Sequence, residues 1–137
     1  LKIIAQNALE KYNLEENALL CPMIDARRME VYRCIYDTIL NEVSATEPEI
    51  IDENSFAEIL KDRKIYFCGN GAEKCKQFIT HKNAVFLSDV YPLATSMIKL
   101  ANEAYNNKDF ADLAYFEPFY LKAANVTVPK NQLGVRS

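Results

Sequence analysis

Residues 23–32, MIDARRMEVY, place a short charged segment between two runs of mainly apolar residues. The first run, residues 18–24, is almost uninterruptedly apolar, which is typical of a strand covered on both faces, although periodicity alone does not separate it from a buried helix segment. Pro22 within it disfavours a helix and indicates an edge or irregular position. The second run, residues 31–36, is rich in β-branched and aromatic side chains, which suit a half-buried strand. The simplest prediction is a β-hairpin.

The charged residues of this hairpin are candidates for chemistry as well as for turn formation. Asp25 can close the turn by accepting hydrogen bonds from nearby backbone N–H groups. Asp25 and Glu30 are also the best carboxylate pair for acid–base or metal chemistry. Arg27 and Arg28 lie between them and would lower both carboxyl pKa values. We therefore predict that the hairpin has a structural role and no catalytic one.

The residues around the hairpin predict a helix before it and a third strand after it. Residues 1–12 carry apolar side chains at helical spacing with no N-cap ahead of them, which we interpret as a truncated or processed start. Residues 37–52 predict a short third strand and a loop. A capping box at residues 55–58, SFAE, then predicts a short helix that begins at Asn54 or Ser55.

The second half of the chain predicts alternating strands and helices. A helix is expected over residues 72–80 and a short strand over residues 83–87. Ser88 or Asp89 can cap a long helix that has Pro92 in its first turn. Its apolar stripe is predicted to comprise Ala94, Met97, Ile98, Ala101 and Tyr105.

The segment Gly69-Asn70-Gly71 follows a predicted strand at residues 64–68 and supplies a turn with freedom for positive φ. Its backbone N–H groups and the start of the following helix can in principle hold a phosphate. The segment is neither a GxGxxG motif nor a P-loop, so a plain strand-to-helix turn is the simpler interpretation. Gly69, Asn70 and Gly71 are kept as candidate cofactor-binding residues.

The order of these elements predicts an α/β fold with a mixed sheet flanked by helices. A three-stranded meander followed by alternating helices and strands is the arrangement of a ribonuclease-H-like or actin-like half-domain. Residues 115–122 form an aromatic, proline-bearing segment that we expect to be extended and to pack back over the domain. Residues 123–137 are expected to form a mobile tail.

Composition restricts the partners that such a domain can have. The chain has 137 residues, half of them apolar, which is enough for one domain with a core. Its net charge of −3 argues against a broad electrostatic grip on nucleic acid or anionic lipid, but leaves a local basic patch open. No apolar run approaches the roughly 20 residues of a membrane span. With no signal peptide visible, a cytoplasmic protein is expected.

Cysteine, histidine and aromatic residues offer few catalytic or ligand-binding groups. The cysteines lack zinc-site spacing and are predicted to be buried free thiols; they are Cys21, Cys34, Cys68 and Cys75. The single histidine, His81, is predicted to lie at the surface, so no metal site is expected. Without a basic surround, the aromatic residues are expected to serve core and interface rather than base stacking; they include Tyr32, Tyr36, Tyr66, Phe67, Tyr115, Phe116, Phe119 and Tyr120.

Two motifs resemble those of the TsaB family, also called YeaZ and often labelled glycoprotease-like. Residues 24–32, IDARRMEVY, resemble the family's IDAR..EVY hairpin, and residues 117–122, EPFYLK, resemble its P-x-Y-L-R/K segment. The glycine turn at residues 69–71 and Pro92 also lie at matching places. The signature positions are Asp25, Arg27, Glu30, Tyr32, Pro118, Tyr120 and Leu121.

The resemblance implies which part of such a protein this chain represents. TsaB-like proteins have two actin-like subdomains, and residues 1–122 resemble the second alone. The first subdomain, with its D-T-A/S strand and its G-P-G-S-F-T-G-L/V-R segment, has no counterpart in the sequence. Exposure of the face that this subdomain would cover, including part of the predicted helix at residues 1–12, predicts a homodimer.

The resemblance also implies a function. Members of the family are non-catalytic subunits that assemble with TsaD and TsaE to make threonylcarbamoyladenosine in tRNA, and TsaD carries the metal and the transfer chemistry. The family's partner-binding helices lie largely in the first subdomain, which is absent here. We therefore expect TsaD-like and TsaE-like partners for the full-length protein, with no cofactor, no active site and no strong direct nucleic-acid binding. One alternative is the nucleotide-binding half of an actin-like kinase or hydrolase. Another is a peptidase, although the sequence offers no Ser/His/Asp set for it.

Overall fold

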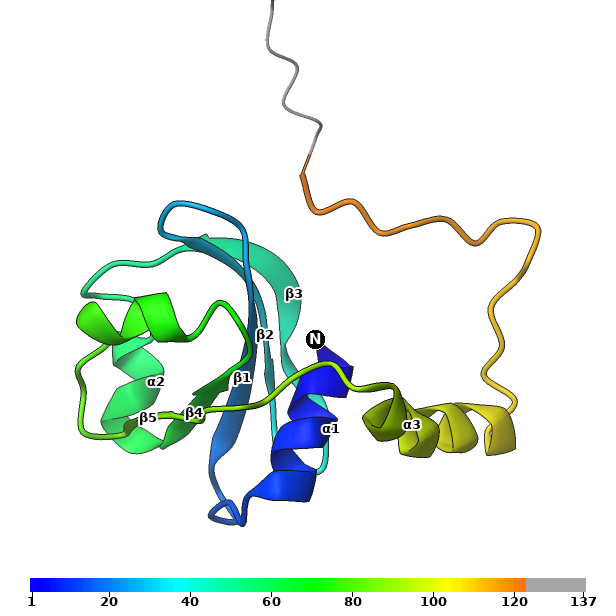
Figure 1. Ribbon diagram of the computed structural model, residues 1–137, viewed down its shortest axis with the longest axis horizontal. Coiled ribbons are helices and arrows are strands. Elements are labelled where there is room, and N and C mark those ends of the chain that lie inside the picture. Colours follow the sequence, from blue (N-terminus) through cyan, green and yellow to red (C-terminus); the bar gives the residue numbers. More distant parts are fainter. Residues whose placement is uncertain (123–137) are drawn as a thin grey trace, which may run out of the picture.

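The computed structural model describes residues 1–122, which form a five-stranded mixed sheet with helices on both faces (Figure 1). This arrangement confirms the predicted α/β class. In chain order the elements are α1 (Lys2–Lys11), β1 (Leu19–Asp25), β2 (Glu30–Tyr36), β3 (Glu42–Ile50), α2 (Ala57–Asp62), β4 (Ile65–Cys68), the 3-10 helix η1 (Glu73–Gln77), β5 (Ala84–Phe86) and α3 (Ala94–Asn106).

The sheet has the strand order β3-β2-β1-β4-β5. Strand β1 is antiparallel to β2, which is antiparallel to β3, whereas β1, β4 and β5 run parallel. Because neighbouring side chains of a strand point to opposite faces, β1 supplies two cores. Leu19, Cys21 and Met23 pack with α2 and η1, and Leu20 packs with α1 on the other face. Figure 1 shows α2 and η1 on one side of the sheet and α1, followed by α3, on the other.

The predicted hairpin is confirmed, with Ile24 opposite Tyr32 and Asp25 opposite Val31. Of the two positions expected for Pro22, an edge or an irregular one, the edge is wrong, because Pro22 is fully buried in the central strand. An apolar run of this kind is stable where both faces of the strand are covered, as the two cores on either side of β1 provide. Strand β1 pairs with β2 at Leu20 and again from Met23 onward. Pro22, which has no N–H to donate, lies between these paired positions, where the β1–β2 ladder is interrupted.

Strand β3 extends from Glu42 to Ile50 and is longer than the short third strand that the sequence predicts. Pro48 lies within it, opposite Tyr32 of β2. Because β3 is the edge strand, a residue that lacks an N–H donor can be accommodated without loss of a bond to a further strand.

The predicted capping box at residues 55–58 is wrong. The Ser55 hydroxyl accepts a hydrogen bond from the Asp52 N–H at 3.0 Å and donates one to the Asp52 carboxylate at 3.2 Å. This local turn competes with helix capping. Helix α2 therefore begins at Ala57, after Phe56 in the left-handed region at φ 63°.

The helix predicted over residues 72–80 is also wrong, because only a 3-10 helix, Glu73–Gln77, forms there. Helix α3 begins at Ala94 without a side-chain cap, so neither Ser88 nor Asp89 caps it. Their carbonyl groups instead accept hydrogen bonds from the Tyr12 hydroxyl and the Lys11 ammonium group of the α1 segment. These two hydrogen bonds hold the loop around residues 88–89 against α1, and helix α3 starts after that loop.

Helix α3 packs on α1 through the buried Ser96, and the partly buried Leu100 packs against the same core as α1. Ser96 is fully buried, accepts a hydrogen bond from the Asn7 amide at 3.2 Å and donates one to the Glu10 carboxylate at 2.6 Å. The expected apolar stripe does not face the core, because Met97 and Ile98 are 48% and 59% exposed. The spacing of apolar residues indicated a helix correctly, but the stripe that it marks is largely exposed.

The segment at residues 115–122, which was expected to pack back over the domain, does so only at its end, and its aromatic side chains are largely exposed. Tyr115, Phe116, Phe119 and Tyr120 are between 75% and 84% exposed. The segment returns toward the sheet at its end, where Lys122 contacts Glu30 (Figure 1). The tail predicted for residues 123–137 lies outside the described residues.

Candidate functional site

The glycine turn after β4 packs directly against the backbone of β1. Gly69 has φ +89°, and a Cβ atom there would lie less than 3.0 Å from the Met23 carbonyl oxygen. A Cβ atom on Gly71 would lie 3.0 Å from the Asp25 nitrogen. The Gly71 N–H donates to the Met23 carbonyl at 3.1 Å. Both glycines are therefore needed for the close approach of this turn to the central strand.

Asn70 connects the glycine turn to the start of the hairpin turn. Its side-chain oxygen accepts a hydrogen bond from the Asp25 N–H at 3.1 Å. The Asp25 carboxylate accepts one from the Arg27 N–H at 2.8 Å, which confirms the predicted closure of the turn by this carboxylate. Arg27 and Arg28 both adopt positive φ, at 69° and 49°. The turn therefore holds two arginines in a conformation that usually favours glycine or asparagine.

Lys74, in η1, stabilises the same hairpin through three hydrogen bonds. Its ammonium group donates to the Asp25 carboxylate, to the Arg28 carbonyl at 2.8 Å and to the Glu30 carbonyl at 2.7 Å. The hydrogen bond from Lys74, followed by that from the Arg27 N–H, lowers the pKa of Asp25. Sequence reasoning assigned this effect to the arginines and missed Lys74, which lies 49 residues away in the chain.

The second carboxylate of the hairpin has a different partner. Glu30 pairs with Lys122 at 2.5 Å, which brings the end of the C-terminal motif to the hairpin. Asp25 and Glu30 therefore form separate ion pairs and do not share a proton or a metal ion in this arrangement. An ionised, paired carboxylate is a poor general acid.

Several signature positions from the two ends of the sequence meet on one surface. Tyr32, Tyr120 and Leu121 line a cavity of about 530 Å³ between the sheet and the returning segment, together with Lys122. Pro118 is not part of this lining. The structure thus brings the hairpin motif and the C-terminal motif together, although about ninety residues separate them in sequence.

The carboxyl ends of parallel strands β4 and β5 border a second cavity, of about 310 Å³. Such a crevice is where α/β sheets often bind ligands. Gly69 and Asn70 line it, but so do the acidic residues Glu73 and Asp89, and the Gly71 N–H is already used by β1. The following 3-10 helix has five residues. This geometry gives no support to phosphate binding at the glycine turn.

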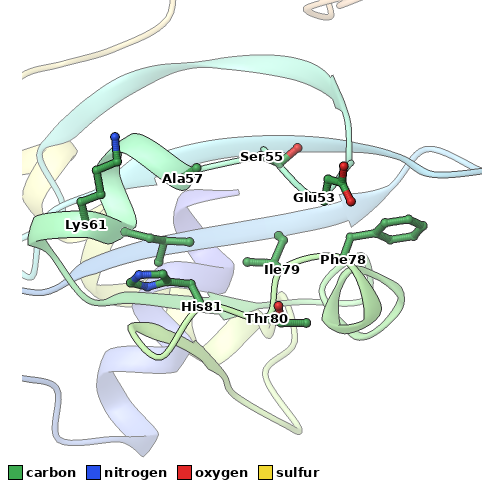
Figure 2. A pocket seen from close by; sticks show the side chains of 9 residues that line it. Glu53, Ser55, Ala57, Lys61, Phe78, Ile79, Thr80 and His81 are labelled. Atoms are coloured by element: carbon green, nitrogen blue, oxygen red, sulfur yellow. The ribbon is translucent and has the colours of Figure 1, made fainter.

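A third cavity, of about 350 Å³, lies between α2 and the loop before β5 (Figure 2). It contains Ser55 and His81, the residue types of a hydrolase. The Ser55 hydroxyl is bonded to Asp52, and His81 Nδ1 accepts a hydrogen bond from the Asn83 N–H at 3.2 Å. Figure 2 shows Ser55 beside α2 and His81 on the opposite wall. The two side chains therefore have separate partners and form no catalytic pair.

The remaining candidate nucleophiles are buried cysteines. All four are free and buried, as the sequence predicts, and His81 is exposed, as expected. Burial raises the pKa of Cys68 to about 12 and that of Cys75 to about 11, so neither thiol is a ready nucleophile at neutral pH. Within residues 1–122, no three His, Cys, Asp or Glu side chains gather closely enough to hold a metal ion.

Comparison with known proteins gives a match at the level of the fold. No protein-family model and no curated protein matches the sequence. The fold is similar to the crystal structure of an uncharacterized protein with similarity to peptidase YEAZ from Pseudomonas aeruginosa, with a TM-score of 0.70 and 19% sequence identity. The match covers 89% of this chain but 56% of that chain. At this identity the likeness shows a YeaZ-like fold.

Among residues 1–122, no helix combines the length and the apolar character that crossing a bilayer requires.

Proposed function

We propose that this chain is a non-catalytic scaffold of the TsaB (YeaZ) type, which supports a TsaD-like subunit in the synthesis of threonylcarbamoyladenosine in tRNA. The observation that carries the proposal is the meeting of the two family-like motifs, through the Glu30–Lys122 ion pair, on a YeaZ-like fold. A chance match of two short motifs would not require them to be neighbours in space.

The state of the polar groups supports a scaffold over an enzyme. Asp25 is held by Lys74 and Glu30 by Lys122, and the serine and histidine of the α2 cavity have separate partners. Catalytic acids and bases need pKa values near the working pH, whereas the Asp25 carboxyl has a lowered pKa. These groups suit a rigid binding surface.

The proposal is tested by depleting the gene product that contains this chain in its own organism. We expect threonylcarbamoyladenosine to fall in hydrolysed tRNA, as measured by liquid chromatography with mass spectrometry, and to recover when the gene is restored. A second, unrelated modified nucleoside in the same tRNA provides the control. Unchanged threonylcarbamoyladenosine after complete depletion would contradict the proposal.

A purification experiment tests the scaffold role separately. The tagged gene product should co-purify with the TsaD-like subunit of the same organism, and calorimetry should detect no ATP binding by the tagged protein alone. Tight ATP binding that is lost when Gly71 is replaced, in a variant that remains folded, would instead favour the kinase or hydrolase alternative.

A further inference from the structure

Residues 109–117 form an exposed segment between α3 and the returning C-terminal motif, which we call the acidic-aromatic arm. Its sequence, DFADLAYFE, contains three carboxylates and no lysine or arginine. Within residues 1–122, none of these carboxylates forms an ion pair. Large apolar side chains in this number on one short segment indicate an interaction site. They are 63–95% exposed and comprise Phe110, Leu113, Tyr115 and Phe116.

The middle of the arm is a single turn that its own hydrogen bonds hold. The Asp112 carboxylate accepts a hydrogen bond from the Ala114 N–H at 2.9 Å. The Asp112 carbonyl accepts two more, from the Tyr115 N–H at 3.1 Å and the Phe116 N–H at 2.8 Å. Asp112 therefore acts as the N-cap of this turn. Because the conformation is already set, the arm loses less entropy on binding than an unstructured segment would.

The tip of the β1–β2 hairpin carries the opposite charge. Its two arginines, Arg27 and Arg28, are exposed, and neither forms an ion pair within residues 1–122. Apolar side chains lie beside them, since Met29 and Ile50 line the same cavity of about 700 Å³. Ile50 is 73% exposed. We call these four residues the hairpin tip. They form a positively charged surface with an apolar wall.

The acidic-aromatic arm and the hairpin tip complement each other in charge and in apolar character. Guanidinium groups bind carboxylates in pairs of parallel hydrogen bonds, and the arginines are held by a turn that Lys74 fixes. The exposed rings of the arm suit the apolar wall at Ile50. Arginine and aromatic side chains are also those that most often dominate the binding energy of interfaces. Because both surfaces belong to this chain, a second copy supplies the partner of each.

The arm does not contact the tip of its own chain in this structure. Residues 109–117 are all exposed, and Figure 1 shows that the segment leaves α3 and runs apart from the sheet before its end turns back. Docking on its own tip would require the chain to reverse within residues 118–121, because Lys122 is held at Glu30. Pro118 favours an extended Glu117, which disfavours such a reversal. The arm of a second copy can approach the tip without one.

We propose that two copies of this chain associate by exchanging arms, so that the acidic-aromatic arm of each docks on the hairpin tip of the other. The exchange gives two identical contacts related by a two-fold axis and closes as a dimer. An aromatic side chain buries about 150–250 Å² when it is covered, so the rings of two arms, at their exposed fractions, can bury roughly 700 Å². The receiving surfaces add a comparable area, and the total exceeds the roughly 1,000 Å² of a specific interface.

This dimer is independent of the proposed function. It also differs from the homodimer that the sequence predicts through the helix at residues 1–12, because most of the apolar side chains of α1 pack on its own sheet. The dimer assigns a role to two arginines whose positive φ is unusual for so large a side chain.

The first experiment measures the dimer dissociation constant of the complete gene product that contains this chain by analytical ultracentrifugation. The wild type should be a dimer that salt weakens. The tip variant Arg27→Asp/Arg28→Asp should raise the dissociation constant about tenfold or more, and aspartate tolerates positive φ, so the turn should be kept. Lys82→Glu/Lys99→Glu is the control, because it changes the net charge equally at exposed positions outside both surfaces and should leave the dimer intact.

The arm variant Asp109→Lys/Glu117→Lys should weaken the dimer in the same way, while Asp112 is kept because it caps the turn. Combining the tip and arm variants in one chain exchanges the two charges, so the combined variant should dimerise again. This recovery separates an arm-to-tip contact from general effects of charge. A monomeric wild type would overturn the proposal, as would a dimer that both the tip and the arm variants retain.

The second experiment uses the wild-type surfaces and therefore does not depend on how the variants fold. A photo-crosslinking phenylalanine analogue at Leu113, which is 95% exposed, should link two differently tagged copies at a peptide that contains Arg27 and Arg28. The same analogue at Ile39, which is 77% exposed between β2 and β3, should not. Crosslinks confined to one copy, or formed with another region of the second copy, would overturn the proposal and leave the proposed function intact.

Discussion

Replacing Gly69 by alanine tests the conclusion that the glycine turn is a packing device for β1. At φ +89°, an L-residue pays about 1–2 kcal/mol for the left-handed backbone. Its Cβ would also lie less than 3.0 Å from the Met23 carbonyl oxygen, a backbone atom of the central strand that cannot rotate away. Overpacking of this kind costs about 1–3 kcal/mol. Together these effects predict a loss of about 3 kcal/mol in the free energy of unfolding.

Urea denaturation followed by circular dichroism measures this loss, and thermal melting should show a decrease of about 12 °C. Gly71→Ala provides a graded comparison, because its Cβ contacts begin at 3.0 Å and its φ is not positive, so a smaller loss of about 1–2 kcal/mol is expected. Asparagine tolerates positive φ, but it still carries a Cβ atom. Gly69→Asn should therefore remain destabilised, within about 1 kcal/mol of Gly69→Ala.

The order of the unfolding free energies of these variants tests the packing argument for the glycine turn. A Gly69→Ala protein within about 0.5 kcal/mol of the wild type would refute the packing argument, since surface changes have effects of that size. Full recovery in Gly69→Asn would show that backbone strain alone matters. Either result would mean that the glycine turn packs less tightly on β1 than its geometry indicates. A ligand-binding role for the cavity at the ends of β4 and β5 would then have to be tested.

Further predictions concern the α1–α3 contact and the thiols. Gln6→Met should change the melting temperature little, because it removes a buried oxygen that has no hydrogen-bond partner within residues 1–122 but also the hydrogen bond from the Gln6 amide to Glu10 at 2.9 Å. Ser96→Ala should increase hydrogen exchange in α3, because two hydrogen bonds to α1 are lost. Hydrogen bonds from Ser96 and Gln6 lower the pKa of Glu10 from its ordinary value of 4.5. The ionised Glu10 side chain should therefore stabilise the fold fully above pH 4.5, and this stabilisation should be lost as the pH falls through the lower pKa of the folded state. The difference in stability between the wild type and Glu10→Gln should accordingly vanish in acid. Cys68 and Cys75 should react with a disulfide reagent only after denaturation.

The hairpin was predictable because its information is local. An apolar run, a charged turn and a β-branched run occur consecutively, and each favours the same structure. The turn closure by Asp25 was predictable for the same reason, since its acceptor and the Arg27 N–H are two residues apart. The position of Pro22 in the central strand was not, because only the two cores on either face of β1 determine it.

The ends of the helices were poorly predicted because competing local interactions decide them. Ser55 has the right spacing for a capping box, but its hydroxyl is bonded to Asp52. Helix α3 shows the converse problem: its periodicity is correct, yet the buried residue is Ser96 and the large apolar residues are exposed. A sequence pattern indicates that a helix has an apolar face, but it does not state what covers that face.

The contacts that build the candidate site are almost entirely long-range. Lys74 reaches Asp25 and Lys122 reaches Glu30 across large separations in sequence. No local pattern indicates that a lysine of a 3-10 helix donates to three acceptors of a hairpin. The family-like motifs indicated which residues matter, whereas only the fold shows that the two motifs share one surface.

The ion pairs of the hairpin indicate whether its carboxylates are suited to catalysis or to a structural role. A lowered carboxyl pKa can mark a catalytic group or a structural ion pair. At Asp25 the cause is Lys74, which also binds two backbone carbonyls of the turn, so the same contact that lowers the pKa fixes the backbone. A proton donor would need the opposite shift. Within the described chain, the hairpin charges left to meet another molecule are those of Arg27 and Arg28, held by this fixed turn. Such an arrangement is suited to binding an anionic group on another molecule.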